Sequence, residues 1–137
     1  MAHHLKIYCK TSALAKLREF IQGKLLGSRL SESEQLQVTL AVEEVCANLI
    51  IHSHNCNGKD HISVEISPNE KEIVIEIIDE GSAFNLLDYT TPDLKKVIGE
   101  KKKGGIGIIL VKKIMDDIQF NTQDGINTCR LIKKISS

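Results

Sequence analysis

The chain has 137 residues with 18 basic and 18 acidic side chains, so its formal net charge is zero and no global field directs it to nucleic acid or an anionic membrane. Aromatic residues make up only 4% and tryptophan is absent, which argues against surfaces that stack nucleic-acid bases. The length fits one domain, residues 1–137, large enough to bury a core.

The sequence also predicts no membrane span and no secretory signal. No apolar run approaches the ~20 residues of a membrane span, and the start MAHHLKIYCK lacks the layout of a secretory signal. The four cysteines lie far apart without a C-x-x-C pair, as is typical of reduced thiols. We therefore expect a cytoplasmic protein.

The first half of the chain predicts a strand and two helices. Residues 4–10, HLKIYCK, alternate well enough for a short strand. A helix is predicted from an N-cap at Ser12 to about Leu26, because leucine and isoleucine recur there at helical spacing. Ser31 and Glu34 form a capping box that opens a second, longer helix, which the segment HNCNGKD ends.

The second half predicts two hairpins around a helix. HISVEIS and EIVIEIIDEG alternate on either side of PNEK, which indicates two paired strands. A polar stretch from Asn85 to about Lys103 follows, and GGIGIILVKKIMDDI predicts a glycine-rich turn running into a helix. IQFNT and TCRLIKKI flank QDGIN as a second hairpin. The expected fold is α+β, a two-layer α/β sandwich with a mixed, mostly antiparallel sheet and helices on one face.

The second helix carries a row of polar residues within LAVEEVCANLIIHSHNC. Glu44, Asn48 and His52 recur at intervals of four, so they share a narrow sector of the helix, which Gln37 joins. Apolar residues flank that sector on both sides. Because a buried carboxylate is costly without a partner, the row indicates either a satisfied polar network in the core or the floor of a ligand cleft. The helix alone leaves both open.

Two further segments place polar or glycine residues beside regular elements. Asp79 continues the inward isoleucine face of its strand at the strand's end, and Gly81 follows, which permits close approach of the backbone. Gly104, Gly105 and Gly107 come after three lysines and precede a helix start, where free amides favour an anion. Each signal is weak alone, because acidic turns end many strands and glycine-rich loops precede many helices.

The order of the three segments resembles the nucleotide boxes of the histidine-kinase-like (GHKL) ATPase superfamily, the Bergerat fold. The first box matches as EEVCANLIIH, the second as DEGSAF and the third as GIGIILVKKIMDDI. In detail the chain is similar to the small anti-sigma-factor serine/threonine kinases of that superfamily. SALAKLREFI resembles their first helix and GINTCRLIKKI their last hairpin, so the resemblance spans nearly the whole chain.

The resemblance implies a role for each matching residue. Asn48 would hold Mg²⁺ on the ATP phosphates, since an amide oxygen suits a hard cation. Glu44, one turn earlier, would be the general base for a serine hydroxyl. The other nucleotide contacts would come from Asp79, Gly81 and Thr128 around adenine, and from Lys103, Gly105 and Gly107 at the phosphates. Arg18 on the first helix resembles a partner-contacting arginine, with a solvated surface charge as the alternative.

The histidines after the polar row have no clear catalytic part. His52 matches the family in position, and we interpret it as structural. HSHNC offers His52, His54 and Cys56 as metal ligands, but it lacks a fourth ligand and the usual zinc spacing.

Three departures from the family pattern stand out. Asn85 and Leu86 follow Phe84 of the second box, where the family usually carries an acid and a proline. Lys103 stands where arginine is common, which replaces a bidentate contact by a point charge. Asn127 stands where glycine is typical. These departures bear on the segment that would close over ATP, and on turnover, more than on nucleotide binding.

Two functions follow as expectations. The first is an ATP-binding anti-sigma-factor protein-serine kinase that sequesters a sigma factor and phosphorylates a serine of a STAS-type antagonist, typically as a homodimer and without direct contact with nucleic acid or membrane. The alternative is a non-catalytic, ATP-dependent protein-binding switch of the same fold. A sensor histidine kinase domain is less favoured, because 137 residues are too few to include the phosphoacceptor helical hairpin as well. Chaperone-like and topoisomerase-like ATPases are excluded by size.

Overall fold

The computed structural model describes residues 3–10, 12–50, 60–80 and 103–135, with the side chains of the last segment described from Ile109 onward. The elements run in the order β1 (His3–Tyr8), α1 (Ala13–Leu25), α2 (Glu32–Asn48), β2 (His61–Pro68), β3 (Glu72–Glu80), α4 (Lys103–Ile114), β4 (Asp117–Gln123) and β5 (Ile126–Lys134). The strands form one five-stranded sheet in the order β1-β2-β3-β5-β4.

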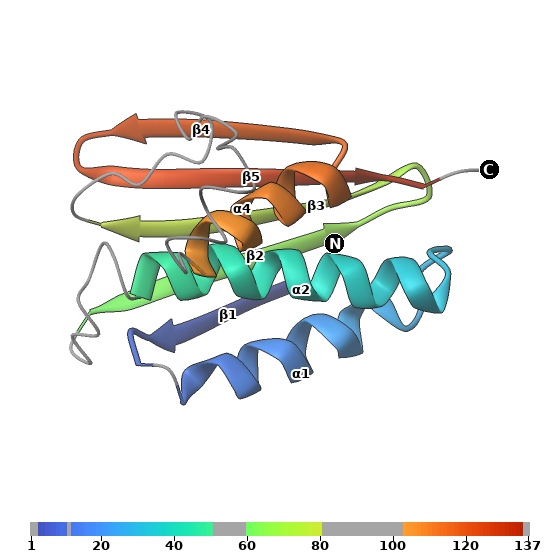
Figure 1. Ribbon diagram of the computed structural model, residues 1–137, viewed down its shortest axis with the longest axis horizontal. Coiled ribbons are helices and arrows are strands. Elements are labelled where there is room, and N and C mark those ends of the chain that lie inside the picture. The colour runs from blue at the N-terminus through green and yellow to red at the C-terminus, as the bar shows by residue number, and fades with distance from the viewer. Residues whose placement is uncertain (1–2, 11, 51–59, 81–102, 136–137) are drawn as a thin grey trace.

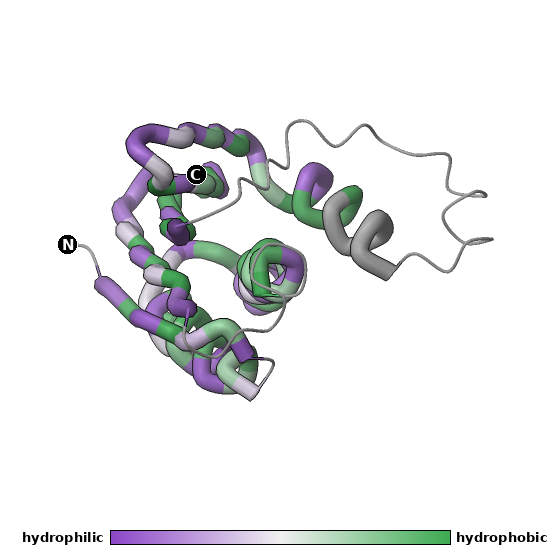
Figure 2. The backbone as a smooth tube through the Cα atoms, turned by 90° about the vertical axis from the view of Figure 1, so that its left-hand side faces the viewer, coloured by the Kyte–Doolittle hydropathy of each residue, from purple (hydrophilic) through white to green (hydrophobic). Residues whose placement is uncertain are grey.

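The helices and the sheet form two layers. In Figure 1 the helices α1, α2 and α4 lie in front of the sheet, and the turned view of Figure 2 places them all on one side of it. The predicted two-layer α+β sandwich is confirmed. We expected a mixed, mostly antiparallel sheet, whereas every pair of neighbouring strands described is antiparallel. No helix among the described residues is long and apolar enough to cross a membrane.

The core lies between the layers and follows the two periodicities of the sequence. Alternate residues of β2 and β3 face the helices, and residues three or four apart on α1 and α2 face the sheet. The fully buried side chains include Ile62, Val64 and Ile66 of β2, Ile73 and Ile75 of β3, Leu17, Ile21 and Leu25 of α1, and Val38 and Val42 of α2. Burying each such side chain contributes roughly 1.5–3 kcal/mol, so this interface fixes how the helices sit on the sheet.

The starts of the two long helices differ from each other. The predicted capping box of α2 is confirmed: the Glu34 amide donates to Ser31 Oγ at 3.1 Å, and the Ser31 amide donates to Glu34 Oε1 at 3.3 Å. Ser12 occupies the predicted N-cap position of α1, but it has helical backbone angles and makes no side-chain cap bond. Since a capping side chain contributes about 1 kcal/mol, α1 depends more on packing than α2 does.

A two-residue turn joins β4 and β5. Asp124 and Gly125 both have positive φ, 54° and 76°, which is the conformation of the Asp-Gly hairpin turn that matches the twist of the strands. The turn sets the pairing of Thr122 with Asn127, and it thereby decides which residues of β5 face the helices.

Candidate functional site

The elements that carry the predicted site residues meet at one end of the molecule. In Figure 1 the last turn of α2, the end of β3, the start of β5 and the first turn of α4 all lie toward the same end. The electrostatics agree with this view. Burial, and then the charge of Asp79 on β3, raise the pKa of Cys129 on β5 to about 12. Asp79 is also among the charges that raise the pKa of Cys46 on α2, after burial, Cys129, Cys9 and Glu43.

Asn48 is held by its own helix. Its side chain is 4% exposed, and its Nδ2 donates to the backbone oxygen of Glu44 at 2.7 Å. A carbonyl oxygen only accepts hydrogen bonds, so the amide nitrogen must face it. The bond therefore fixes the amide plane, and Oδ1 is the atom that Asn48 would offer to a cation.

Glu44 lies one turn before Asn48, at the margin between buried and exposed surface. Its side chain is half-buried. Burial disfavours the charged form and is the larger cause of its raised pKa, and the neighbouring charge of Glu43 raises the pKa further. A carboxylate with increased proton affinity in a partly open position has the properties of a general base.

The polar stripe predicted on α2 has a buried apolar wall on one flank, and on the other flank Ala47 is partly exposed and Ile51 lies outside the described residues. Val38, Val42 and Val45 are buried against the sheet, as expected, whereas Leu40 on the other flank is exposed. The stripe therefore marks the border between the packed face of the helix and its open face. Gln37 is exposed, so the structure does not bring it into a site with Asn48.

Asp79 and Asn127 face the helices from neighbouring strands. The two residues are paired across β3 and β5, and they are 4% and 1% exposed. Asn127 Oδ1 also accepts a hydrogen bond from Thr122 Oγ1 at 2.9 Å. Sequence reasoning named Asp79 correctly as an inward acid, but it named Asn127 only as a departure from the family pattern and not as a site residue. The sequence did contain a signal for it. Asn127 lies four residues before Leu131, and residues separated by an even number on a strand face the same side of the sheet, so an inward Leu131 implies an inward Asn127.

Thr128 does not join Asp79. It pairs with Ile78, and both are partly exposed on the face of the sheet away from the helices. The strand alternation that turns Asn127 and Cys129 inward necessarily turns Thr128 outward. The prediction of Thr128 as an adenine contact is therefore not supported by the strand geometry, and Asn127 occupies the position beside Asp79.

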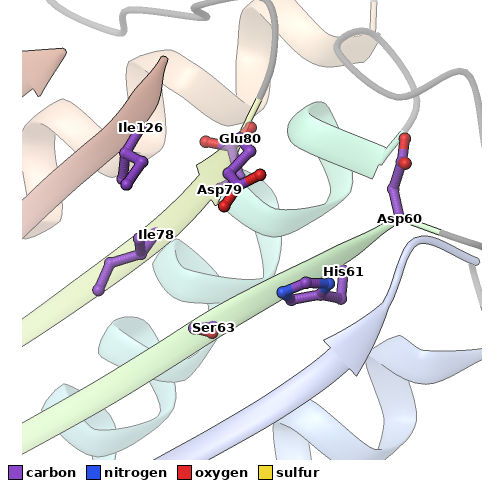
Figure 3. A pocket seen from close by; sticks show the side chains of 7 residues that line it. All are labelled: Asp60, His61, Ser63, Ile78, Asp79, Glu80 and Ile126. Atoms are coloured by element: carbon purple, nitrogen blue, oxygen red, sulfur yellow. The ribbon is translucent and has the colours of Figure 1, made fainter. Parts of the chain in front are cut away.

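A pocket of about 330 Å³ opens beside Asp79, and its lining is mostly that of the outer face. Figure 3 shows this pocket from the outer side, with the helices behind the strands: His61 and Ser63 come from β2, Ile78 and Glu80 from β3, and Ile126 from β5. Neither Glu44 nor Asn48 lines it. Asp79 itself lines it, together with Asp60, so the pocket shares Asp79 with the predicted site but does not reach the polar end of α2.

The helix that contains the glycine-rich segment begins earlier in the chain than expected. α4 starts at Lys103, so Gly104, Gly105 and Gly107 lie within its first two turns and not in a loop before it. An amide near a helix start remains available to an anion only in the first turn. Gly105 is thus better placed for a phosphate than Gly107.

Several predicted residues lie outside the described part of the chain. These are Gly81, the histidines and cysteine of HSHNC (His52, His54 and Cys56), and the segment from Asn85 to residue 102. Among the residues that are described, no group of three or more His, Cys, Asp or Glu side chains could hold a metal ion. The described cysteines Cys9, Cys46 and Cys129 are buried thiols.

Arg18 is neither isolated nor buried. Its guanidinium forms an ion pair with Glu43 of α2, and the arginine side chain is 56% exposed. The expected alternatives were a partner contact and a solvated charge. The structure adds an intramolecular role, because the pair joins α1 to the helix that carries Glu44 and Asn48.

Comparison with known proteins identifies the family of the chain. The family described as histidine kinase-like ATPase domain matches residues 9–133. The serine-protein kinase RsbW of Oceanobacillus iheyensis is 32% identical over 128 residues, which cover 89% of this chain and 80% of that protein. RsbW of Bacillus velezensis is 26% identical over 106 residues, 74% of this chain, and the match spans only 64% of that relative's length. The anti-sigma F factor of Clostridium beijerinckii is 27% identical over 97 residues, 71% of this chain and 68% of that protein.

A solved structure shares the fold. The RsbU and RsbW domains of Rv1364c from Mycobacterium tuberculosis superpose with a TM-score of 0.69 at 15% identity, covering 100% of this chain and 33% of that one. This likeness concerns the fold alone. Taken with the match over residues 9–133, it leads to one conclusion: the chain belongs to the family of histidine kinase-like ATPase domains.

Proposed function

We propose that the chain is an ATP-dependent protein-serine kinase that acts on a regulatory partner protein. Membership in a family of ATPases implies that it uses ATP, and relatives that match it carry the name serine-protein kinase. The observation that carries the proposal is the pairing of Glu44 and Asn48. A half-buried carboxylate with a raised pKa lies one turn from an amide that is fixed by a 2.7 Å hydrogen bond.

In the proposed reaction Glu44 accepts the proton of a serine hydroxyl as the serine oxygen forms a bond to the γ-phosphorus of ATP. The bond between that phosphorus and the oxygen of the β-phosphate breaks, and ADP leaves. Phosphoryl transfer depends mainly on positioning and on charge neutralisation. The raised proton affinity of Glu44 favours proton transfer to it.

The nucleotide would lie across the end of the molecule where α2, β3 and α4 meet. Asp79 is an inward acceptor for the amino group of adenine, and Asn127 lies next to it. Lys103 and Gly105 at the start of α4 would bind phosphate through charge and backbone amides. Gly81 and Gly107 remain proposals from the family resemblance, whereas Thr128 no longer belongs to this set.

Magnesium fits the residues present only as an ion that arrives with ATP. Asn48 offers one hard oxygen, and the described residues provide no cluster of three acidic, histidine or cysteine side chains. Mg²⁺ commonly keeps several waters and is held by one or two protein ligands together with substrate phosphates. Bound in this way, the ion would neutralise phosphate charge during transfer.

The partners follow from the names of the relatives and from the resemblance. Proteins named RsbW and anti-sigma F factor match most of this chain, which supports a sigma factor as the sequestered partner and a STAS-type anti-anti-sigma protein as the phosphoacceptor. We also propose a homodimer and a cytoplasmic location, as for the small anti-sigma kinases that the sequence resembles.

The test is transfer of labelled γ-phosphate from Mg·ATP to a STAS-type protein, with ATP affinity measured separately by calorimetry. We expect Glu44→Gln to abolish transfer while ATP still binds, because an amide cannot take the hydroxyl proton. Glu32→Gln is the matched control, since Glu32 is exposed in the first turn of the same helix, and it should transfer normally.

Two results would contradict the kinase assignment. Transfer that survives in Glu44→Gln would remove Glu44 from the reaction. ATP binding by the unaltered chain without transfer to any STAS-type protein tested would favour the non-catalytic switch, and absence of ATP binding would exclude both functions.

A further inference from the structure

A groove lies between α1 and α2. The two helices run side by side in opposite directions (Figure 1) and are joined by residues 26–31. The groove, which we call the α1–α2 groove, has a volume of about 500 Å³, and its lining includes Glu19, Gly23 and Leu26 of the first helical segment and Glu32, Gln35 and Leu36 of the second. Leu36 precedes Asn48 by about three helical turns, roughly 18 Å, so the groove is remote from the proposed phosphate site.

The groove opens on the side of the helices away from the sheet. Leu17 and Ile21 of α1 are fully buried on the sheet side. At about 100° per residue, Glu19 and Gly23 project from the opposite side of the helix. Both are exposed, so another molecule can reach the groove directly from solvent.

The connection between the helices is fixed by side chains. Gln35 Nε2 donates to Leu30 O at 2.9 Å, and Ser28 Oγ donates to Leu25 O at 2.7 Å. These bonds, with the capping box of α2, hold the two helices at a defined spacing. The α1–α2 groove is therefore formed before any ligand arrives, which lowers the ordering cost of binding.

Three leucines are exposed in or beside the groove. Leu26 is 76% exposed and Leu36 54%, and both line it. Leu40, 45% exposed, follows Leu36 by about one turn on the same side of α2. Single exposed leucines are common on protein surfaces, whereas apolar side chains that share one concave surface mark sites of association.

Gly23 forms an open part of the groove floor. Glycine is less favourable than alanine inside a helix. Apart from its own helix backbone and its two neighbours in the chain, no atom of the described residues lies within 4 Å of the position that a Cβ would take. Packing among these residues therefore does not require a glycine here, and the missing side chain leaves room for a side chain of another molecule.

The charge of the lining is negative. Glu19 and Glu32 are exposed, and among the described residues that line the groove there is no lysine or arginine. Lys24, next to Gly23 in the chain, instead places its Nζ 5.8 Å from the centroid of the Phe20 ring. Glu19 lies about two turns, roughly 10 Å, before the end of α1, whereas Glu32 lies in the first turn of α2. Because the helices are antiparallel, the two acids lie at opposite ends of the groove.

We propose that the α1–α2 groove binds a basic amphipathic helix of a partner protein. Apolar side chains of that helix contact Leu26 and Leu36, and a lysine or arginine at each end contacts Glu19 or Glu32. A groove between two helices accepts a third helix whose anchors recur at intervals of three and four residues. Cations about two turns apart on its face match the spacing of the acids. This docking site goes beyond the proposed kinase function and does not depend on it.

The test is binding of a designed peptide to the full chain without nucleotide, measured by fluorescence anisotropy. The basic peptide is an alanine-rich helix of about 15 residues, with a leucine pair at its centre and a lysine one turn before and one turn after the pair. In a second peptide glutamate replaces the lysines, and in a third alanine replaces the leucines. We expect the basic peptide to bind, and each of the others to bind at least roughly tenfold more weakly.

Gly23→Leu is the decisive variant, because it fills the groove floor from within. We expect it to weaken binding of the basic peptide roughly 10- to 100-fold. Its melting temperature should be unchanged or higher, since leucine favours a helix more than glycine does. Gly27→Leu is the matched control: its Cβ position is equally open, but Gly27 is not among the described residues that line the groove, and this variant should bind normally.

An exchange of charge tests the chemistry of the partner. Glu19→Lys should weaken binding of the basic peptide and strengthen binding of the glutamate peptide, each roughly 2- to 10-fold. Glu65→Lys makes the same change in net charge on the outer face of the sheet, where Glu65 pairs with Glu76, and it should leave both affinities unchanged. Equal effects of Glu19→Lys and Glu65→Lys would contradict a local contact at the groove.

Three other results would overturn the proposal. The first is no binding of the basic peptide, and the second is binding that Gly23→Leu leaves unchanged. The third is self-association of the unaltered chain, seen by analytical ultracentrifugation and lost in Gly23→Leu, which would show that a second copy occupies the groove. None of these measurements needs ATP, so failure here leaves the kinase assay unaffected, and failure of the kinase assay leaves the docking site standing.

Discussion

The two faces of the sheet differ at the edge where β3 ends and β5 begins. On the face toward the helices, Asp79 and Asn127 are buried side by side. On the opposite face, Ile78, Glu80 and Ile126 line an open pocket of about 330 Å³. Asp79 also lines that pocket, but a step of one residue along either strand turns a side chain from the helix face to the outer face of the sheet. The face of the sheet that a side chain occupies, and not nearness in sequence, decides which residues act together.

The largest expected difference between the faces concerns stability. Ile75 is fully buried on the inner face, and Ile78 is partly exposed on the outer one. We expect Ile75→Ala to lower the free energy of unfolding by about 2–5 kcal/mol, because it leaves a cavity in the core. Ile78→Ala should lower it by less than half as much. Urea unfolding measures both, and equal losses would contradict the assignment of the faces.

The next difference concerns nucleotide affinity. We expect Asp79→Asn to weaken ATP binding roughly 10- to 100-fold, because a hydrogen bond to a charged acceptor contributes about 1.5–3 kcal/mol. Glu80→Gln, one residue along and exposed, should bind ATP as the unaltered chain does. Calorimetry with Mg·ATP gives both affinities, and melting curves check that each variant is folded. Unchanged affinity in Asp79→Asn would remove Asp79 from the site.

The smallest difference separates two neighbours on β5. Asn127→Ala should weaken ATP binding roughly 2- to 10-fold, since a neutral hydrogen bond contributes about 0.5–1.5 kcal/mol. Thr128→Ala should leave the affinity unchanged, because Thr128 lies on the outer face with Ile78. Calorimetry again decides. If Thr128→Ala binds ATP more weakly than Asn127→Ala, then Thr128, the residue named from the family resemblance, contacts the nucleotide, and the alternation of side chains along β5 has been misinterpreted.

The sequence predicted those parts of the fold that depend on local chemistry. The Ser31–Glu34 capping box, the Asp-Gly turn and the alternation around Ile75 each rest on a few neighbouring residues, and the structure contains all of them. Asp79 was found because it continues an apolar alternation with an acid. The ordered boxes then gave the family, which local patterns could not have given.

The remaining features depend on register and on long-range contacts. Thr128 was chosen by its place in a motif, whereas its orientation depends on the pairing of β5 with β3. The start of α4 at Lys103 contradicts the expectation of a glycine-rich turn, because glycine's cost in a helix is small enough for context to override. The Arg18–Glu43 pair joins residues 25 positions apart, so no local pattern could have predicted it.

The reactivity of the buried thiols measures how often the core opens to solvent. Burial raises the pKa of Cys46 and Cys129, the latter to about 12, and only a thiolate reacts readily with alkylating reagents. Both sulfurs are buried in the structure and therefore react slowly. Their modification reports the fraction of time that the space between helices and sheet is open to solvent. A ligand that holds α2 against β3 would slow that modification, so mass spectrometry of the alkylated chain could rank ligands without any label attached to them.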